Sequence, residues 1–276
     1  MPITWSIRTS LACIAAVTAF WAGGNSHDLS AQAPQKTSTV AQLIAKVLAA
    51  RSTSGFRIRA KLTRMSGASS VKVTRQLLTR GRRDGDATSV AYQVIWPADA
   101  AGRAVVVKDA GDHRSTGFIY DGHSAVPLTK AALAAPLFDS DLLIEDVLEG
   151  FWYWPSRAIA GNEVIDKRPC ERIEFRPGPE TQTTYTKAVA CVSVELAVVL
   201  RLDLYGSAGA PLKQITTDRL VRRDDHWLAG SVTVVPRDHE HRTTLEGSEY
   251  EGNLQIPESE FSVAAIANFG KTPGRL

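Results

Sequence analysis

The chain has 276 residues and a mass of 29.9 kDa, with 44% hydrophobic residues, 22% charged residues and a mean hydropathy of -0.11. These values fit one large folded domain or two small ones, and they exclude a disordered or collagen-like chain. A net charge of +3 is too small to indicate a nucleic-acid-binding protein. No apolar run reaches the roughly 20 residues that span a bilayer as a helix.

The first 33 residues have the composition of an export signal. Arg8 precedes a short apolar run, residues 11–22, and the Ala-Gln-Ala segment at 31–33 has the small-residue spacing of a cleavage site. We therefore predict a signal peptide over residues 1–33 and one mature domain over residues 34–276. A short membrane anchor that is never removed is the alternative interpretation.

Removal of this signal leaves two cysteines, Cys170 and Cys191, in the mature chain. A Pro-Gly-Pro-Glu turn signal at 177–180 separates two alternating segments, 170–175 and 184–192, and this pattern is typical of a hairpin. If the two cysteines lie opposite each other, a disulfide closes a loop of about 20 residues and stabilises the fold by about 3 kcal/mol. Two reduced cysteines on adjacent strands are the alternative.

A short amphipathic helix is predicted at the start of the mature chain. Apolar residues at positions 40, 43, 44, 47 and 48 follow helical spacing, and Thr39 with Gln42 has the sequence of a capping box. Gly55 marks the end of this segment, and the pattern then changes to the two-residue periodicity of strands.

Strands separated by Gly, Pro, Asp and Ser turn signals make up most of the remaining chain. The predicted strands are residues 56–64, 71–80, 90–96, 103–108, 117–120, 168–175, 184–192, 196–205, 212–222, 227–235 and 242–250. Short strands joined by turns indicate an antiparallel sheet, so we predict a mainly β fold of about eleven strands with few helices.

The less regular middle of the chain, residues 121–155, contains two features. Residues 141–149 are predicted to form a helix, with Ser140 placed to cap it. The run Phe-Trp-Tyr-Trp-Pro at 151–155 then concentrates four aromatic rings. These rings are interpreted either as a core plug at the end of the sheet or as a lip that contacts lipid or another hydrophobic ligand.

No catalytic signature is present in the sequence. A nucleophile elbow, a P-loop, a dinucleotide-binding glycine motif and a zinc-protease motif are all missing. The His-Glu-His segment at 239–241 offers two nitrogen ligands, but two ligands do not make a metal site, and a charged hairpin loop explains the segment. We therefore expect neither an enzyme, nor a bound cofactor, nor a resident metal.

Five segments, in the same order, resemble the LolA-like family of outer-membrane lipoprotein-sorting proteins. They are residues 136–147 (the G-S-D-F-[ST]-x-E-D-L signature), 96–102 (P-x-x-x-x-G), 161–170 (G-x-E-x-[IV]-x-G-K-P-C), 204–213 and 256–262. The similarity spans residues 55 to 265. It departs from the family at Asp139 and Asp166, where the family has Gly, and at Leu142, where the family has Phe.

The resemblance implies a half-open antiparallel β-barrel covered by helices, which encloses an apolar groove for acyl chains in the periplasm. A carrier of this kind needs no catalytic group. The implied partners are lipoprotein acyl chains or lipid and an inner-membrane transporter complex, and the protein is expected to be a monomer that binds no nucleic acid. A periplasmic lipid-sensing or regulatory protein on the same scaffold is the alternative function.

Two sets of residues are assigned on this hypothesis. The apolar groove is predicted to be lined by Val90, Tyr92, Val94, Trp96, Val105, Val107, Leu200, Leu202 and Leu204. The signature residues Ser140, Asp141, Glu145 and Asp146 are interpreted first as a helix cap and an acidic helix that fix the chain crossover, and second as a docking surface for a partner.

Overall fold

One antiparallel sheet of thirteen strands frames the part of the chain that the computed structural model describes, residues 39–50, 54–67, 72–84, 87–109, 115–223 and 225–269. These residues belong to one compact unit, Ser38–Leu276. The predicted signal peptide lies outside the described residues.

The strands are β1 (Gly55–Ser66), β2 (Lys72–Asp84), β3 (Ala87–Trp96), β4 (Ala104–Asp109), β5 (Ser115–Tyr120), β6 (Ala125–Pro127), β7 (Ser156–Ile165), β8 (Arg168–Arg176), β9 (Lys187–Ser193), β10 (Val198–Tyr205), β11 (Pro211–Arg223), β12 (His226–Pro236) and β13 (His241–Glu251). The α-helices are α1 (Val40–Ala50), α2 (Lys130–Leu133) and α3 (Val263–Asn268). Short 3₁₀ turns are η1 (Leu137–Asp139), η2 (Asp146–Leu148), η3 (Gly150–Tyr153) and η4 (Glu258–Phe261).

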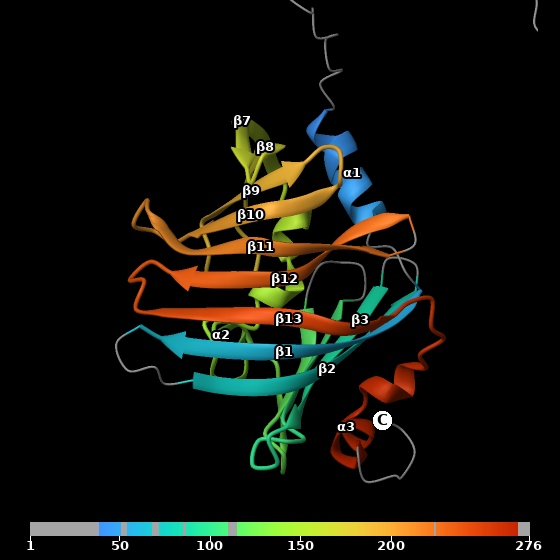
Figure 1. Cartoon of the computed structure of the whole chain (residues 1–276). Coiled ribbons are helices and arrows are strands. Elements are labelled where there is room, and N and C mark those ends of the chain that lie inside the picture. Colours follow the sequence, from blue (N-terminus) through green and yellow to red (C-terminus); the bar gives the residue numbers. More distant parts are fainter. Residues whose placement is uncertain are drawn as a thin grey trace, which may run out of the picture. The chain divides into compact units, whose positions relative to one another are not determined.

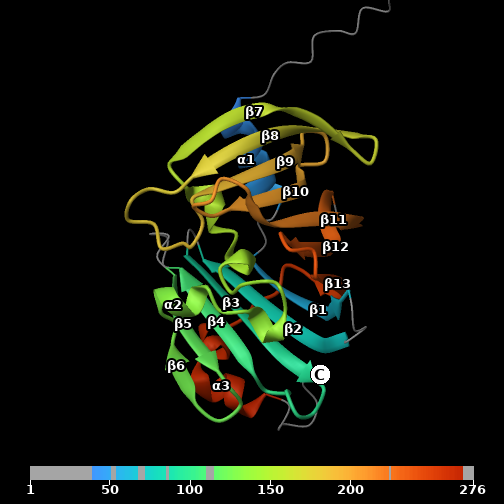
Figure 2. The same cartoon turned by 90° about the vertical axis from the view of Figure 1, so that its left-hand side faces the viewer.

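The strand order shows how the sheet is assembled. Consecutive strands pair from β1 to β6 and from β7 to β13, and β1 pairs with β13 to join the two halves. The sheet curls but does not close, so β6 and β7 remain as its two free edges (Figure 2). This arrangement confirms the prediction of a mainly β, half-open antiparallel barrel.

The sequence pattern located eleven of these strands and missed β6 and β7. β6 has three residues, too few to show a period. β7 is exposed over most of its length, and its register with β8 shifts between Ile159 and Gly161. Because an edge strand of this kind has no buried face, its apolar and polar residues do not alternate.

Helix α1 forms as the sequence predicted and covers one part of the concave face. The Thr39 N–H donates to Gln42 Oε1 at 3.0 Å, and the Gln42 N–H donates to Thr39 Oγ1 at 3.3 Å, so both halves of the capping box are present. Its buried face packs against strands β8 to β10 and the turn η3; it consists of Leu43, Ile44 and Val47. Figure 1 shows the helix beside these strands.

The connection between β6 and β7, residues 128–155, joins the two free edges of the sheet and packs on its concave face (Figure 2). We refer to it as the crossing segment. The prediction of a helix over 141–149 is wrong, because this stretch contains only the short turn η2 and ends at Glu149 with a left-handed φ of 48°. The side chain of Asp146 accepts a hydrogen bond from the Leu143 N–H at 2.7 Å, which stabilises a local turn in place of a helix.

The opposite face of β3 to β5 is covered by η4 and α3. Phe261 and Ile266 pack there against Ala91, Ala104 and Val106. These strands are therefore buried on both faces, which fixes the position of the concave surface that they present on the other side.

A disulfide joins Cys170 and Cys191, whose Cα atoms are 5.4 Å apart. The strands β8 and β9 are antiparallel neighbours, but Cys191 pairs with Arg172 and not with Cys170. The predicted register was therefore wrong by two residues. A two-residue displacement keeps both cysteines on one face of the sheet, so the disulfide runs diagonally between the strands.

Candidate functional site

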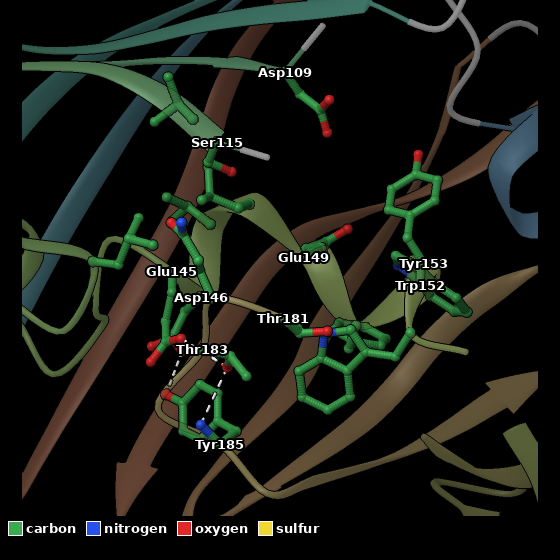
Figure 3. Close-up of a pocket in the computed structure, with 18 of the residues that line it drawn as sticks. Asp109, Ser115, Glu145, Asp146, Glu149, Trp152, Tyr153, Thr181, Thr183 and Tyr185 are labelled. Carbon is green, nitrogen blue, oxygen red and sulfur yellow. Dashed lines mark hydrogen bonds between the residues drawn. The ribbon is translucent and has the colours of Figure 1, made fainter. Parts of the chain in front are cut away.

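A cavity of about 490 Å³ lies on the concave face of the sheet. Strands β2 to β5 form one side, β10 forms another, and the crossing segment and the loop 178–185 complete the lining (Figure 3). Its size falls in the range of pockets that hold small organic ligands.

Aromatic and aliphatic side chains make up much of the cavity wall. The apolar lining residues are Val90, Val107, Leu133, Leu148, Leu202, Leu204, Phe151, Trp152 and Trp154, together with Leu48 of α1. These residues come from both halves of the sheet and from two segments that cover it, so several elements together form the apolar lining.

The aromatic turn η3 is held by a cluster of rings. The ring centroids of Phe151 and Trp152 are 4.8 Å apart, and Phe175 of β8 lies 5.3 Å and 5.5 Å from them in edge-on contacts. Phe151, Trp152 and Trp154 are buried, whereas Tyr153 is 38% exposed. The run therefore packs as a plug, as one of the two interpretations expected, and it also forms a wall of the cavity.

Polar groups gather on the side of the cavity formed by the ends of β2 to β5. Arg83, Asp109 and Ser115 line it there, and Glu149 faces them from the crossing segment. Figure 3 shows the carboxylates of Asp109 and Glu149 directed into the same space. An apolar wall with charged groups on one side suits an amphiphilic ligand.

Glu145 fastens the crossing segment to the loop before β9. Its carboxylate accepts hydrogen bonds from the Thr183 hydroxyl at 2.9 Å, from the Thr184 N–H at 3.0 Å and from the Thr184 hydroxyl. The residue is only 9% exposed. A buried carboxylate with this many donors is compensated for its loss of water.

Asp146 makes a second and deeper anchor. Its carboxylate lies 2.9 Å from Lys213 Nζ of β11, and the two side chains are 0% and 8% exposed. The Tyr185 hydroxyl donates to the same carboxylate at 2.6 Å. Burial, together with the adjacent Asp146 charge, raises the pKa of Tyr185 above its ordinary value, so this hydroxyl stays protonated as a donor.

The start of the crossing segment is anchored to the other half of the sheet. Asp141 accepts from Arg64 Nε at 2.9 Å and from the Thr243 hydroxyl at 2.8 Å. Burial disfavours ionisation of Asp139, but hydrogen bonds from Arg103 and Arg75 outweigh it and lower the pKa of this carboxyl. Ser140 is buried; its hydroxyl accepts from the Leu142 N–H at 3.2 Å, and its own N–H donates to the Leu137 carbonyl at 3.1 Å.

The signature residues thus lie along one segment and contact β1, β11, β13 and the loop before β9 through their side chains. Ser140, Asp141, Glu145 and Asp146 do not cap or build an α-helix, because only the short 3₁₀ turns η1 and η2 form here, so that part of the sequence interpretation is corrected. Their role in fixing the crossover, and a role in docking, stay predictions.

Four of the nine residues predicted for the groove line the cavity: Val90, Val107, Leu202 and Leu204. Tyr92, Val94 and Val105 share the concave face but pack beneath the crossing segment. The Tyr92 hydroxyl donates to the Val147 carbonyl at 3.0 Å, and burial raises the pKa of this tyrosine.

Two predicted groove residues lie on the opposite face of the sheet. The register between β2 and β3 shifts so that Trp96 pairs with Gln76, and Trp96 is 49% exposed. The register between β9 and β10 likewise shifts between Val199 and Arg201, which turns Leu200 away from the concave face. On the opposite face, Leu200 packs against the Cys170–Cys191 disulfide. Each β-bulge inserts one residue and so reverses the face of what lies beyond it.

Other lining residues were not predicted from the sequence. Arg83, Asp109 and Ser115 lie at strand ends next to hairpin turns, and residues 178–183 form the loop between β8 and β9. No pattern in these stretches marks them, since polar residues at turns are what any hairpin contains. Their placement together results from the curvature of the sheet.

No group of three or more His, Cys, Asp or Glu side chains among the described residues is placed to hold a metal ion. No helix in the described part of the chain is long and apolar enough to cross a membrane.

Comparison with known proteins identifies a matching family and several structures with the same fold. A family model described only as an uncharacterized protein matches residues 87–268, about two thirds of the chain. The chain belongs to this family. The matched region contains the crossing segment, the eleven strands from β3 to β13 and the helix α3. No match was found among curated proteins.

Several solved structures share the fold. A DUF1329 family protein from Desulfovibrio piger has a TM-score of 0.76 and 18% identity, covering 81% of this chain and 96% of that one. A domain from Vibrio parahaemolyticus, described as an outer membrane lipoprotein-sorting protein, has a TM-score of 0.73 and 16% identity over 82% and 97%. A LolA superfamily protein from Nitrosomonas europaea has a TM-score of 0.65 and 14% identity over 82% and 98%. The fold is therefore LolA-like, which confirms the resemblance.

Proposed function

We propose that this protein is a periplasmic, non-enzymatic carrier that binds the acyl portion of a lipoprotein or lipid and sorts it towards the outer membrane. The observation that carries the proposal is the cavity of about 490 Å³, whose wall is formed by aliphatic and aromatic residues on the concave face. Export by the signal over residues 1–33 and delivery by an inner-membrane transporter complex belong to the same proposal.

The free energy of acyl-chain burial makes such a carrier useful. Each methylene exposed to water costs about 0.8 kcal/mol, so a chain of about 14 methylenes costs on the order of 11 kcal/mol. Apolar lining from β3, β4, β10 and η3 offsets much of this cost in transit. Polar groups on one side, such as Asp109 and Ser115, leave a place for a head group.

The proposal is tested by native mass spectrometry of the mature protein purified from periplasmic extract, followed by lipid identification. A near-stoichiometric acylated species supports the carrier function. Titration with a fluorescent single-chain lysophosphatidylcholine then measures affinity. A protein that is isolated empty and also fails to bind this probe refutes the proposal, whereas turnover of an ester would indicate an enzyme.

A matched pair of variants assigns the binding to the cavity. Val90→Trp fills the cavity from a half-buried wall position and is expected to reduce probe affinity at least tenfold. Thr216→Trp is the control, because its neighbour Ile215 faces the concave clusters and Thr216 therefore faces away. Equal affinities of the two folded variants would contradict the assignment.

A further inference from the structure

Part of the cavity wall is a loop that is not packed into the core. Residues 178–183, between β8 and β9, all line the cavity, and Figure 2 shows this loop extending outward from the ends of the two strands. Pro179, Glu180 and Gln182 are exposed. The hydrophobic clusters of the described chain contain none of the residues 177–184. The β8–β9 loop, residues 177–184, therefore covers the cavity without burial in the apolar core.

A single carboxylate joins the β8–β9 loop to the rest of the cavity wall. Within the described part of the chain, every hydrogen bond from the loop to another segment ends on Glu145. This carboxylate accepts from the Thr183 hydroxyl at 2.9 Å, from the Thr184 N–H at 3.0 Å and from the Thr184 hydroxyl. The other hydrogen bonds of the loop are local. The closed position of the loop thus depends on one side chain of the crossing segment.

The two other covers of the concave face are held more firmly. Helix α1 buries Leu43, Ile44 and Val47 against the sheet. The crossing segment has its own buried apolar core, and the Asp146–Lys213 ion pair joins it to β11. Segments with few buried apolar contacts open at a lower free energy than packed ones. Of the three covers, the β8–β9 loop is therefore expected to open first.

Only the contacts with Glu145 need to break for the loop to open. The loop ends at Tyr185, which is buried and donates to Asp146 at 2.6 Å, so this residue stays with the sheet. Glu145 lies at the cavity wall close to Thr183 (Figure 3), where water that enters an open cavity can replace the lost donors. A carboxylate that exchanges protein donors for water is not left buried and unpaired.

We propose that the β8–β9 loop is the gate through which a ligand enters and leaves the cavity, and that Glu145 is the latch that holds the gate closed. The inference rests on the proposed function and adds to it the route of ligand exchange. The latch is closed in both the empty and the loaded protein. It therefore sets the rates of binding and release more than it sets the affinity.

Stopped-flow kinetics with the fluorescent lysophosphatidylcholine test the gate. Thr183→Val with Thr184→Val removes both hydroxyl donors to Glu145 and keeps the branched shape of the side chains. Because hydrogen bonds to a charged group are stronger than neutral ones, we expect the association and dissociation rate constants to rise together by about tenfold. The Kd is then expected to change by less than about threefold, since both rate constants rise.

Thr186→Val is the matched control. Its hydroxyl donates to the Gly206 carbonyl at 2.8 Å, and Thr186 does not line the cavity. Both rate constants of this variant are expected to stay at the wild-type values, and far-ultraviolet circular dichroism verifies that all variants are folded. A faster dissociation with an unchanged association rate constant in the double variant would overturn the gate, because a loop that only supports the wall gives that result.

Native-state hydrogen exchange measures the opening of the loop without any ligand. The Thr184 N–H, which donates to Glu145, is expected to exchange through a local opening. In Glu145→Gln, which lacks the charge of the acceptor, this exchange is expected to be about tenfold faster. Exchange of the Ile144 N–H, which donates to the Ala135 carbonyl within the crossing segment at 3.0 Å, is expected to be unchanged.

The two measurements separate the gate from the carrier function. If the wild-type protein binds no probe, the carrier function is refuted, whereas a local opening at Thr184 would still support the loop as the gate of this cavity. If the probe binds but the Thr184 N–H exchanges only through global unfolding, the carrier function stands and the gate is overturned. Equal acceleration of Thr184 and Ile144 in Glu145→Gln would also overturn the gate, because the crossing segment would then open with the loop.

Discussion

Substitution of Asp146 by alanine is expected to destabilise the protein strongly. The Asp146 carboxylate is completely buried, lies 2.9 Å from Lys213 Nζ, and also accepts from the Tyr185 hydroxyl at 2.6 Å and the Leu143 N–H at 2.7 Å. Breaking a buried pair by removing one partner costs about 3–5 kcal/mol, because the other charge is left uncompensated. For a domain of this size, that corresponds to a fall in Tm of about 6–20 °C.

The measurement is thermal unfolding followed by far-ultraviolet circular dichroism, with urea unfolding to obtain the free energy. Glu249→Ala is the control: it removes the partner of Arg59 from an ion pair at 3.1 Å in which the glutamate is 71% exposed. An exposed pair of this kind contributes about 0–1 kcal/mol. The control is therefore expected to melt close to the wild-type protein.

A double variant, Asp146→Leu with Lys213→Met, tests the physical reason. Removing both charges leaves no uncompensated ion, so this protein is expected to be more stable than Asp146→Ala alone. A Tm of Asp146→Ala within 2 °C of the wild type would refute the structural role of this residue. If that protein also lost binding to a membrane partner, the docking interpretation of the signature would be the better one.

Two further results are expected from other parts of the sheet. Replacing Cys170 and Cys191 together by serine opens the covalent loop and is expected to cost about 3 kcal/mol in urea unfolding; an unchanged midpoint would contradict this. Hydrogen bonds from Arg201 lower the pKa of Glu163, although partial burial opposes them. The stabilisation of the fold by this pair is therefore present above the unfolded-state pKa of Glu163 and is lost as the pH falls through its folded-state pKa. Glu163→Gln is therefore expected to show a flatter decline of Tm between pH 5 and pH 3 than the wild type, and parallel curves would contradict it.

The sheet could be predicted from the sequence because burial leaves an apolar pattern in its strands. In β4, which is buried on both faces, the pattern is a continuous apolar run, and in β10 the apolar residues recur along the strand; both patterns can be read without any knowledge of the neighbouring strands. The edge strand β7 lacks this constraint, since most of its residues are exposed on both faces. β7 was not predicted because it is an exposed edge strand, and such a strand has no buried face to impose an apolar pattern.

The face of the sheet on which each side chain lies was harder to predict than the strands themselves. Alternation places Trp96 with Val94 and Leu200 with Leu202, but a bulge in each strand breaks the count. Whether a bulge forms depends on the pairing with the neighbouring strand, and residues far apart in the chain decide that. Periodicity therefore predicts a strand more reliably than it predicts which residues reach a site.

The wrong prediction of a helix over residues 141–149 shows a different limit of sequence-based prediction. The acidic composition of this segment resembles the first turn of a helix, where carboxylates interact with backbone N–H groups. In the structure, Glu145 and Asp146 bond instead to Thr183, Thr184, Tyr185 and Lys213, more than 30 residues away in sequence. Tertiary contacts of this strength outweigh a local preference worth less than about 1 kcal/mol.

The same tertiary contacts connect stability to binding capacity. Because the crossing segment joins the two free edges of an open sheet, its packing decides how much of the concave face is core and how much is cavity. Loosening an anchor such as Asp146 should then both lower the Tm and change the affinity for the fluorescent lysophosphatidylcholine. A destabilised Asp146→Ala protein whose affinity for this probe also changes would link the two properties directly, whereas lower stability with unchanged affinity would mean that the cavity is bounded by the strands alone.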